Sequence, residues 1–500
     1  MIAAAMAAPR LTWAQSGSRT PKFHISPPYG FINDPQRPLW SNNVWNLWVL
    51  WNADYPNGNG TAWRRYTSTD LINWTDQGVS IPKYTNAYGD VWTGSTVVDV
   101  NNTAGHGYGA VIAIMTMPCD NTNGTSGQNQ SNALWYSNDG GVTFSFDSIV
   151  LPNYPGNNTP FRDPSVFWHA PSGEWILSLA EAGKLSIYGS PDLQHWSYKS
   201  GMLRNDIGQM ECPNMFQLHL YNSDGTTVED KWVLLCGGDG SSFGFTRGTH
   251  YWVGWFDGTT FTPDEWNGQW LDGGPDCYAT TVFHDPNTPD PLAYAYAISW
   301  ENNWDYAQGM PLSGYPGQLS ITRQLRLQLV NGTAILFNTP IGAQNNVFQS
   351  SVQGSNQTIS DSVPYQWPGW ASDSACRVDF TISPVNGFWA GAIYFSVRGG
   401  DGYFTQVGFE PGAGNAFLKR DTCGPAPVQD SAWNANRNVP CDYGNPVSVS
   451  VFVDSGSIEV FLNDGRIAIS AQITAPLDAT GLNLTTSGGS AYISDLVIMT

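Results

Sequence analysis

Four copies of one local pattern, each a strand, a polar turn with an aspartate and then an aromatic residue, occur within the first 261 residues. They occupy residues 66–74, 136–144, 188–196 and 255–261. Their turn aspartates, separated by about 50 to 70 residues, are Asp70, Asp139, Asp192 and Asp257. That spacing is the length of one four-stranded blade of a β-propeller. The pattern therefore predicts a radial repeat, and the alternative is a set of unrelated hairpins that share common turn chemistry.

The rest of the chain also predicts strands rather than helices. Short apolar runs such as 44–51 and 110–116 are bounded by Gly, Pro, Asn and Asp, and long amphipathic helical patterns are nearly absent. Strands near 294–300 and 318–327 suggest a fifth blade. Beyond about residue 340, segments such as 376–382 alternate apolar and polar residues, as the strands of a β-sandwich do.

We therefore predict an all-β protein made of a five-bladed β-propeller followed by a C-terminal β-sandwich. The predicted bounds are 20–338 for a catalytic propeller domain, 339–365 for a packed linker and 366–500 for the sandwich. The first strand of each propeller blade lines the central channel. Carboxylates that are far apart in the sequence can consequently meet at the mouth of that channel.

The charge of the chain excludes some partners and favours others. Its 500 residues carry a net charge of −20, which repels nucleic acid and anionic membrane surfaces and favours a neutral or cationic ligand. Only 12% of the residues are charged, whereas 23 are tryptophans, whose flat rings can contact sugar faces. The alternative is that these tryptophans fill a β-rich core.

Several features predict a secreted glycoprotein. The small, apolar start, residues 1–8, resembles the remnant of a signal peptide, and no apolar run is long enough for a transmembrane helix. Sites with the N-glycosylation pattern are frequent, and they include Asn59, Asn73, Asn123, Asn331, Asn356 and Asn483. Among the 7 cysteines, Cys423 and Cys441 are candidates for a disulfide bond. No cysteine and histidine set has zinc-ligand spacing, so we expect neither a metal nor a cofactor.

Three carboxylates stand in distinctive local sequences. Asp34 lies in the turn-rich segment 28–38, Asp163 follows Arg162 and precedes a proline, and Glu211 stands beside Cys212 in an apolar run. An Asp-Pro pair is usually a turn, which is the structural alternative for the two aspartates. A glutamate in an apolar run is costly to bury without a partner or a function.

These carboxylates would have a clear chemistry if they share a pocket. Two carboxylates about 5 Å apart repel by roughly 3 kcal/mol at an effective dielectric near 20, which is enough to keep one protonated in mildly acidic solution. The more apolar setting selects Glu211 as the acid, and Asp34 then attacks an anomeric carbon. Arg162 would hold Asp163 ionised for binding sugar hydroxyls.

The sequence resembles glycoside hydrolase family 32, the invertases, inulinases and levanases, over nearly its whole length. The similar motifs, in order, are 33–35, 92–95, 161–164, 211–213, 276–279, 300–304 and 453–461. The resemblance implies a five-bladed propeller joined to a β-sandwich, and retaining cleavage of β-fructofuranosides in fructans. It also implies that Asp34 is the nucleophile, Asp163 the transition-state stabiliser and Glu211 the acid/base.

The chain departs from the usual family pattern around the expected sugar pocket. Gln36 and Arg37 replace the usual Asn-Gly after the nucleophile motif, Trp51 replaces a glutamine, and Trp63 begins a segment where a Trp-Gly-His motif is expected. This loop and residues 314–323 are most similar to the levan fructotransferase-like members. The alternative function is therefore release of a cyclic difructose anhydride, when a hydroxyl of the same bound chain replaces water.

The candidate substrate-binding residues are Asn33, Gln36, Trp51, Trp63, Trp92, Ser95, Arg162, Asp276, Tyr278 and Trp304. For the first three of these tryptophans the alternative is the blade core, and for Asp276 and Tyr278 it is a strand-end turn. Arg37 and Arg323 either orient the pocket or pair with surface acids.

Two further hypotheses stay open beside the retaining fructan-cleaving enzyme. One is a propeller that binds sugar without catalysis, and the other is an inverting furanosidase, in which the working carboxyls stand farther apart. The expected partner is a fructan or fructo-oligosaccharide. The residues do not decide between levan, inulin and sucrose, between exo and endo action, or between oligomeric states.

Overall fold

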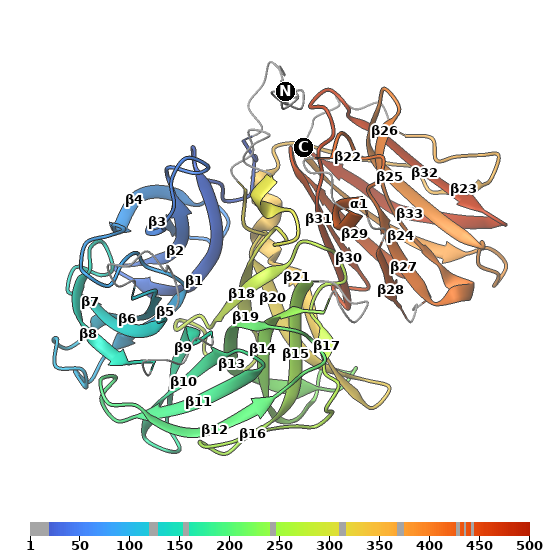
Figure 1. Ribbon diagram of the computed structural model, residues 1–500. Helices are drawn as coiled ribbons and strands as arrows, with labels where there is room; N and C mark the ends of the chain where they lie inside the picture. The colour runs from blue at the N-terminus through green and yellow to red at the C-terminus, as the bar shows by residue number, and fades with distance from the viewer. Residues whose placement is uncertain are drawn as a thin grey trace, which may run out of the picture.

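The computed structural model describes residues 20–119, 129–153, 160–240, 247–309, 317–367, 375–426, 431–434, 437–441 and 445–500. The described chain is almost entirely β-structure, and its α-helix is the short α1 (Ser431–Asn434). Figure 1 shows two bodies, a propeller built from the first two thirds of the chain and a sandwich that follows it. None of the helices described is long and apolar enough to cross a membrane.

The predicted five blades are confirmed. Blade 1 comprises β1 (Phe31–Ser41), β2 (Val44–Asn52), β3 (Ala62–Ser68) and β4 (Thr75–Ile81). Blade 2 comprises β5 (Gly94–Asp99), β6 (Ala110–Met117), β7 (Ser131–Ser137) and β8 (Ser145–Leu151). Blade 3 comprises β9 (Arg162–His169), β10 (Glu174–Glu181), β11 (Lys184–Ser190) and β12 (Ser197–Leu203). Blade 4 comprises β13 (Met210–Tyr221), β14 (Thr227–Asp239), β15 (Arg247–Phe256) and β16 (Phe261–Pro263), and the short β17 (Gln269–Trp270) pairs with β15. Blade 5 comprises β18 (Tyr278–Phe283), β19 (Ala295–Trp300), β20 (Arg323–Val330) and β21 (Thr333–Pro340). A short parallel pairing of β13 with β20 joins these last two blades.

The turn aspartates explain why the repeat was visible in the sequence. Each lies between the third and fourth strand of its blade and accepts hydrogen bonds from backbone N–H groups two to four residues ahead. In blade 5 the corresponding turn is instead Asn331-Gly332, in which both residues have positive φ. The fifth copy therefore lacks the aspartate, and the sequence pattern shows only four.

The C-terminal part is a β-sandwich, as predicted. One sheet contains β22 (Ser351–Gln353), β23 (Gln357–Ser360), β24 (Cys376–Pro384), β29 (Val447–Val453), β30 (Ser457–Leu462), β31 (Ile467–Gln472) and β33 (Ser490–Met499). The other contains β25 (Ala392–Gly400), β26 (Tyr403–Glu410), β27 (Asn415–Lys419), β28 (Arg437–Pro440) and β32 (Gly481–Ser487). Short 3-10 helices span Ala307–Gly309, Gly342–Val347 and Pro411–Ala413.

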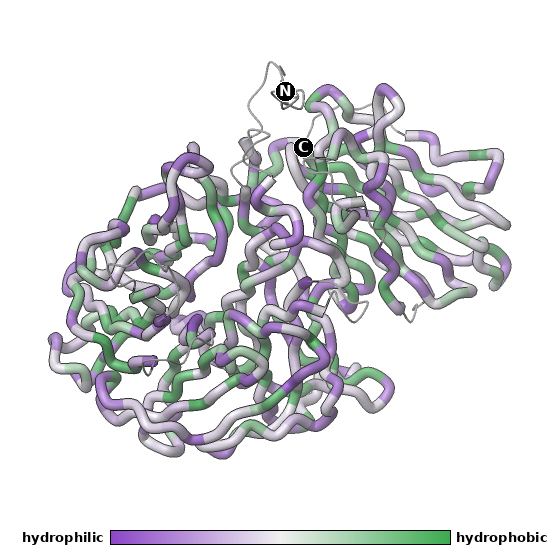
Figure 2. Tube along the Cα trace, viewed as in Figure 1, coloured by the Kyte–Doolittle hydropathy of each residue, from purple (hydrophilic) through white to green (hydrophobic). Residues whose placement is uncertain are grey.

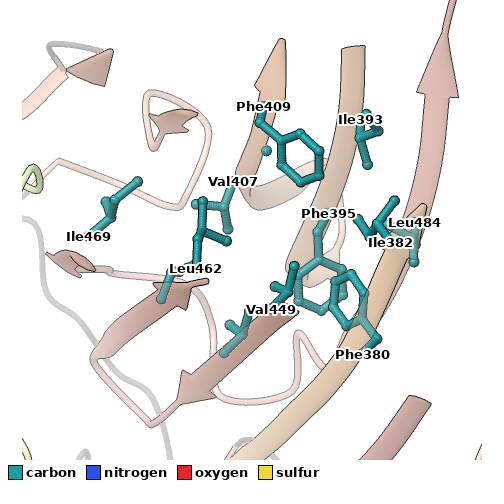
Figure 3. Close-up of a pocket in the computed structure, with 13 residues that line it drawn as sticks. Phe380, Ile382, Ile393, Phe395, Val407, Phe409, Val449, Leu462, Ile469 and Leu484 are labelled. Atoms are coloured by element: carbon teal, nitrogen blue, oxygen red, sulfur yellow. The ribbon is translucent and has the colours of Figure 1, made fainter. Parts of the chain in front are cut away.

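The core of the sandwich is dry and closely packed. Figure 3 shows apolar side chains such as Phe380 and Val449 from one sheet meeting Phe395 and Leu484 from the other. The void left between them is about 20 Å³, and apolar side chains line it, so it is a packing gap rather than a ligand site. Figure 2 shows the same organisation along the chain, with hydrophobic residues concentrated on the strands of both bodies.

Buried ion pairs hold the propeller against the sandwich. Arg323 of β20 pairs with Asp272, at 2.9 Å, and with Glu459 of β30, and all three side chains are almost fully buried. Asp276 pairs with Arg420 at 2.8 Å in the same junction. The prediction that Asp276 lies in the sugar site is therefore wrong, and Arg323 pairs with buried rather than surface acids.

The segment before β1 also belongs to this junction. Asp454 accepts hydrogen bonds from the backbone N–H groups of Lys22 and Phe23 and from the His24 ring, while the other ring nitrogen of His24 lies 2.9 Å from Glu459. The late sequence motif 453–461 thus contributes to domain docking. The suggested Cys423–Cys441 disulfide bond is not formed, and the Cys423 thiol lies 3.7 Å from the Thr474 hydroxyl.

Replacement of Arg323 by methionine tests the importance of the junction. We expect R323M to lower the free energy of unfolding by about 3–5 kcal/mol, because it leaves Asp272 and Glu459 buried without their cation. The matched control is R64M, whose pair with Asp76 is more exposed and should cost no more than about 1 kcal/mol. Equal losses in urea unfolding of the two variants would contradict this account.

Candidate active site

The propeller brings the three predicted carboxylates together. Asp34 comes from β1, Asp163 from β9 and Glu211 from β13, so three different blades supply them. All three line a pocket of about 370 Å³. The pocket also includes Asn33, Trp92, Arg162 and Trp304 of the predicted set.

Each carboxylate is presented by a β-bulge at the start of an innermost strand. The register of β1 shifts between Ile32 and Pro35, and those of β9 and β13 shift at the corresponding places. Asp163 (φ 63°) and Cys212 (φ 50°) adopt left-handed backbone conformations there, which non-glycine residues rarely do. A proline follows each carboxylate, Pro35 at the end of its bulge and Pro164 and Pro213 within theirs, where no ladder N–H is required. The Asp-Pro pairs are therefore bulges that re-aim side chains, not ordinary turns.

Asp34 is buried but hydrogen-bonded. Its Oδ2 accepts a hydrogen bond from the Thr93 hydroxyl at 2.5 Å, and its Oδ1 accepts one from the Asn33 amide at 3.2 Å. Burial raises the pKa of Asp34, the hydrogen bond from Thr93 opposes this, and the charge of Glu211 adds to the rise.

A thiol lies between the two aspartates. Cys212 Sγ is 3.6 Å from Asp34 Oδ2 and 3.6 Å from Asp163 Oδ2, while the Cys212 backbone N–H donates to Asp163 at 3.0 Å. Burial raises the pKa of Cys212 well above its usual value, so the thiol stays a neutral donor between two acids.

Burial raises the pKa of Asp163 to about 7, against the opposing charge of Arg162. The sequence predicted that Arg162 would hold Asp163 ionised, but the pKa of Asp163 is raised despite that charge: Arg162 Nη2 makes an ion pair with Glu211, whereas its Nε is 3.8 Å from Asp163. In mildly acidic solution the Asp163 side chain is therefore a protonated carboxylic acid, which can both donate and accept a hydrogen bond.

Glu211 lies in a polar setting, contrary to the apolar one expected from the sequence. Besides Arg162, it accepts hydrogen bonds from Tyr278 Oη at 2.6 Å and from Gln209 Nε2 at 3.1 Å. Its side chain is 16% exposed, compared with 6% for Asp163. Burial raises the pKa of Tyr278 well above its usual value, so this tyrosine remains a donor to Glu211.

Four other candidates lie outside the pocket lining. Trp63 is fully buried in the blade core, Trp51 packs under the Arg64 guanidinium, and Ser95 accepts the backbone N–H of Val166. Gln36 is also fully buried, and it joins the Asp34 carbonyl to the Gly94 N–H of the next blade. None of these four side chains lines the pocket.

The pocket contains residues that the sequence reasoning missed, namely Phe31, Leu50, Asn52, Tyr55, Asn59, Thr61, Thr93 and Gln308. Thr93 lies within the family-like motif 92–95, so the sequence offered a reason to expect it near the site. Tyr55 and Gln308 offered none, because their proximity arises only where blades 1 and 5 meet, with Tyr55 Oη donating to the Gln308 carbonyl at 2.6 Å. In the quoted segment 314–323, residues 314–316 lie outside the described residues.

Metal-ligand spacing occurs in one group of the described residues, His24, Glu301 and Glu459, which lies at the domain junction. His24 there is already hydrogen-bonded to Asp454 and Glu459, and these bonds, with the nearby Glu301, raise its pKa to about 10 against the opposing effect of burial. The group fits a buried imidazolium between acids better than a neutral metal ligand.

Comparison with known proteins gives consistent matches over both bodies. Residues 24–340 match the model of the glycosyl hydrolases family 32 N-terminal domain, and residues 342–500 match that of the glycosyl hydrolases family 32 C terminal. The chain is 36% identical over 485 residues to a levanbiose-producing levanase of Bacillus subtilis (strain 168), covering 95% of this chain and 90% of that protein.

Two further similarities concern one more sequence and one solved structure. A levanbiose-producing levanase of Geobacillus stearothermophilus is 42% identical over 333 residues, which cover 66% of this chain and 81% of that protein. The crystal structure of an exo-inulinase from Aspergillus awamori superposes with a TM-score of 0.82 at 26% identity, covering 97% of this chain and 98% of that one.

The raised pKa of Asp163 makes a prediction about stability. The folded protein binds this proton more tightly than the unfolded chain, so the stabilisation is present at low pH and is lost as pH rises through about 7. We expect D163N to be more stable than the parent at pH 8, by at most about 4 kcal/mol, but not at pH 4. Thermal unfolding across this range measures it.

The control variant, D139N, should change the pH dependence of stability in the opposite direction. Hydrogen bonds from Ser137 and Thr143 lower the pKa of Asp139 to about 2, although its partial burial opposes them. D139N should therefore lose stability above about pH 4. A parallel pH dependence of the two variants would show that the burial of Asp163 does not control its proton.

Proposed function

This chain belongs to glycoside hydrolase family 32, and from that premise we propose that it cleaves β-fructofuranosidic bonds of fructans through a covalent fructosyl-enzyme intermediate. One observation carries the proposal: Asp34, Asp163 and Glu211, each aimed by a bulge, meet in one pocket of the family's N-terminal domain. Two carboxyls of different environment are what acid-assisted glycosidic cleavage requires.

In the first step Glu211 protonates the leaving oxygen while Asp34 attacks the anomeric carbon. The glycosidic bond breaks, an ester forms between Asp34 and the fructosyl unit, and the remaining chain leaves with the proton. Glu211 then takes a proton from water, and the resulting hydroxide equivalent attacks the ester and releases the fructosyl product. Tyr278 and Arg162 orient Glu211 for both proton transfers.

Asp163 supports the transition state without transferring the fructosyl unit. Its carboxyl group, beside Asp34 across the Cys212 thiol, is placed to bind hydroxyls of the fructosyl ring. Interactions that strengthen as the ring becomes oxocarbenium-like lower the barrier more than they tighten substrate binding. Asn33, Trp92 and Trp304 supply the polar and flat apolar contacts that a furanose ring needs.

Levan is the proposed substrate and a difructose the proposed product. Two relatives with 36% and 42% identity are named levanbiose-producing levanases, and they support this choice. The structural neighbour is an exo-inulinase, so inulin is the second candidate. None of these names favours the fructotransferase alternative.

Extracellular action fits the surface of the protein. The described sequon asparagines Asn59, Asn73, Asn331, Asn356 and Asn483 are all exposed, as attachment of a glycan requires. Asn123 and residues 1–8 lie outside the described residues. Asn73, Asn331, Asn356 and Asn483 are proposed as glycan acceptors, whereas Asn59 lines the pocket of the three carboxylates.

Substitution of the two working carboxyls tests the mechanism. D34N and E211Q should each lower kcat on levan by at least about a thousandfold, because one removes the nucleophile and the other the acid. The test for an ester uses β-fructofuranosyl fluoride, whose leaving group needs little protonation. We expect intact-mass spectrometry to show a fructosyl adduct with E211Q and none with D34N.

The same experiment separates the remaining hypotheses. An inverting enzyme gives no adduct with either variant, whereas a protein that only binds sugar shows no turnover before substitution. Full turnover by D34N and E211Q on levan, inulin and sucrose would remove the basis for assigning these residues.

Product analysis tests the substrate assignment. The unmodified protein is incubated separately with levan, inulin and sucrose, and the products are weighed by mass spectrometry. We expect the highest rate on levan, with a hydrated difructose as the main product. A difructose lighter by one water would instead identify intramolecular transfer, and free fructose alone would identify single-unit release.

A further inference from the structure

Arg37 is a cation placed inside the propeller at a position where the family commonly has glycine. It follows Asp34 by three residues on β1 and reaches across to β9 of the third blade. Its Nη1 donates to the Val166 carbonyl, and its Nη2 donates to the Ser165 hydroxyl at 2.8 Å. Its own carbonyl accepts the Thr96 hydroxyl of the second blade at 2.8 Å. One residue thus ties three blades together.

The charge of Arg37 has no counterion among the described residues. No ion pair joins it to a described carboxylate, and its Nε is buried without a hydrogen-bond partner. Burial lowers the pKa of Arg37 to about 10, which still leaves the guanidinium charged at neutral pH. A partly buried cation without a counterion is costly, so a merely space-filling role would be better served by an apolar side chain.

The contact between Arg37 and Val166 joins β1 and β9 at the same number of residues beyond the carboxylate that each strand carries. Arg37 is three residues beyond Asp34 on β1, and Val166 is three residues beyond Asp163 on β9. At about 3.3 Å per residue, the Cα atoms of Arg37 and Val166 lie roughly 10 Å along their strands from those of Asp34 and Asp163. The contacts of Arg37 therefore fix the distance between the strands that present Asp34 and Asp163.

Other charged and titratable groups face the same channel. They are Asp34 on β1, Asp163 and Arg162 on β9, Glu211 and Cys212 on β13, and His284 after β18. The pKa of His284 is lowered, first by burial and also by the charge of Arg37. Above Arg37 there are three acids and one other arginine, so its positive charge favours their ionised forms.

We propose that Arg37 is a positioning residue of the active site, which holds β1 against β9 and supplies positive potential beneath Asp34 and Asp163. The proposal rests on the proposed function of those two carboxyls. Displacement of a reacting group by about 1 Å can cost a hundredfold in rate, so a link three residues from the nucleophile has a direct effect on turnover.

Three variants test the proposal with kcat, KM and the pH profile of kcat/KM on levan. R37M removes the charge and both hydrogen bonds, R37K keeps a charge, and the matched control R65M removes a half-buried arginine from the same blade, where Arg65 contacts Asn46 rather than the channel. Thermal unfolding is measured for each variant.

We expect R37M to lower kcat roughly ten- to a hundredfold with KM changed less than about threefold, because the reacting groups shift more than the binding surface does. Loss of the cation makes Asp34 harder to ionise, so the acid limb of kcat/KM should move up by about half to one pH unit. R37K should restore the position of that limb and only part of kcat. R65M should retain the parent profile.

An R37M enzyme with the parent kcat and acid limb would overturn the proposal, as would an R65M enzyme that loses activity to the same extent. If R37M does not fold, R37K decides: the parent acid limb with reduced kcat supports the proposal, and a fully parental enzyme overturns it. Failure of the proposed function is distinct, because then D34N retains turnover whatever Arg37 does.

Discussion

Mutual repulsion among three neighbouring carboxylates, two of them buried, is the constraint around which the pocket is built. Burial raises the pKa of both Asp34 and Asp163, and the charge of Glu211 adds to the rise at each of these aspartates. The structure offsets this with neutral donors near the aspartates and with Arg162 and Tyr278 at Glu211. The environments of the carboxyls therefore differ, and that difference gives them separate roles.

Carboxylates are also buried close together at the domain junction, but there they hold the two domains in contact. There, Asp272, Asp276 and Glu459 are also buried, but each has an arginine within ion-pair distance. The ion pairs of these three acids hold the two domains in one specific contact. The same residue types thus serve docking at the junction and chemistry at the channel mouth, where Asp34 has neutral donors and Arg162 is shared between Glu211 and Asp163.

Local sequence patterns predicted the fold and the three carboxylates because both depend on local chemistry. The Asp70 turn and its three repeats are read within a few residues, and each carboxylate lies beside a proline or an apolar run. Contacts between side chains of different blades cannot be read from the local sequence. The sequence could not show that Arg162 prefers Glu211 to its neighbour Asp163, that Trp63 turns into the blade core, or that Asp276 faces the sandwich. Those choices are made by packing between distant strands.

The departure at Gln36 and Arg37 has a different meaning from the one that the sequence suggested. Both side chains lie outside the pocket lining and link β1 to neighbouring blades, on the strand that presents Asp34. Choice of product must then depend on groups that contact the bound chain. At the seam of blades 1 and 5, Tyr55 and Gln308 line the pocket and bond to each other, and their contact forms part of its wall. That part of the wall is therefore formed jointly by two blades, just as three blades bring the carboxylates together.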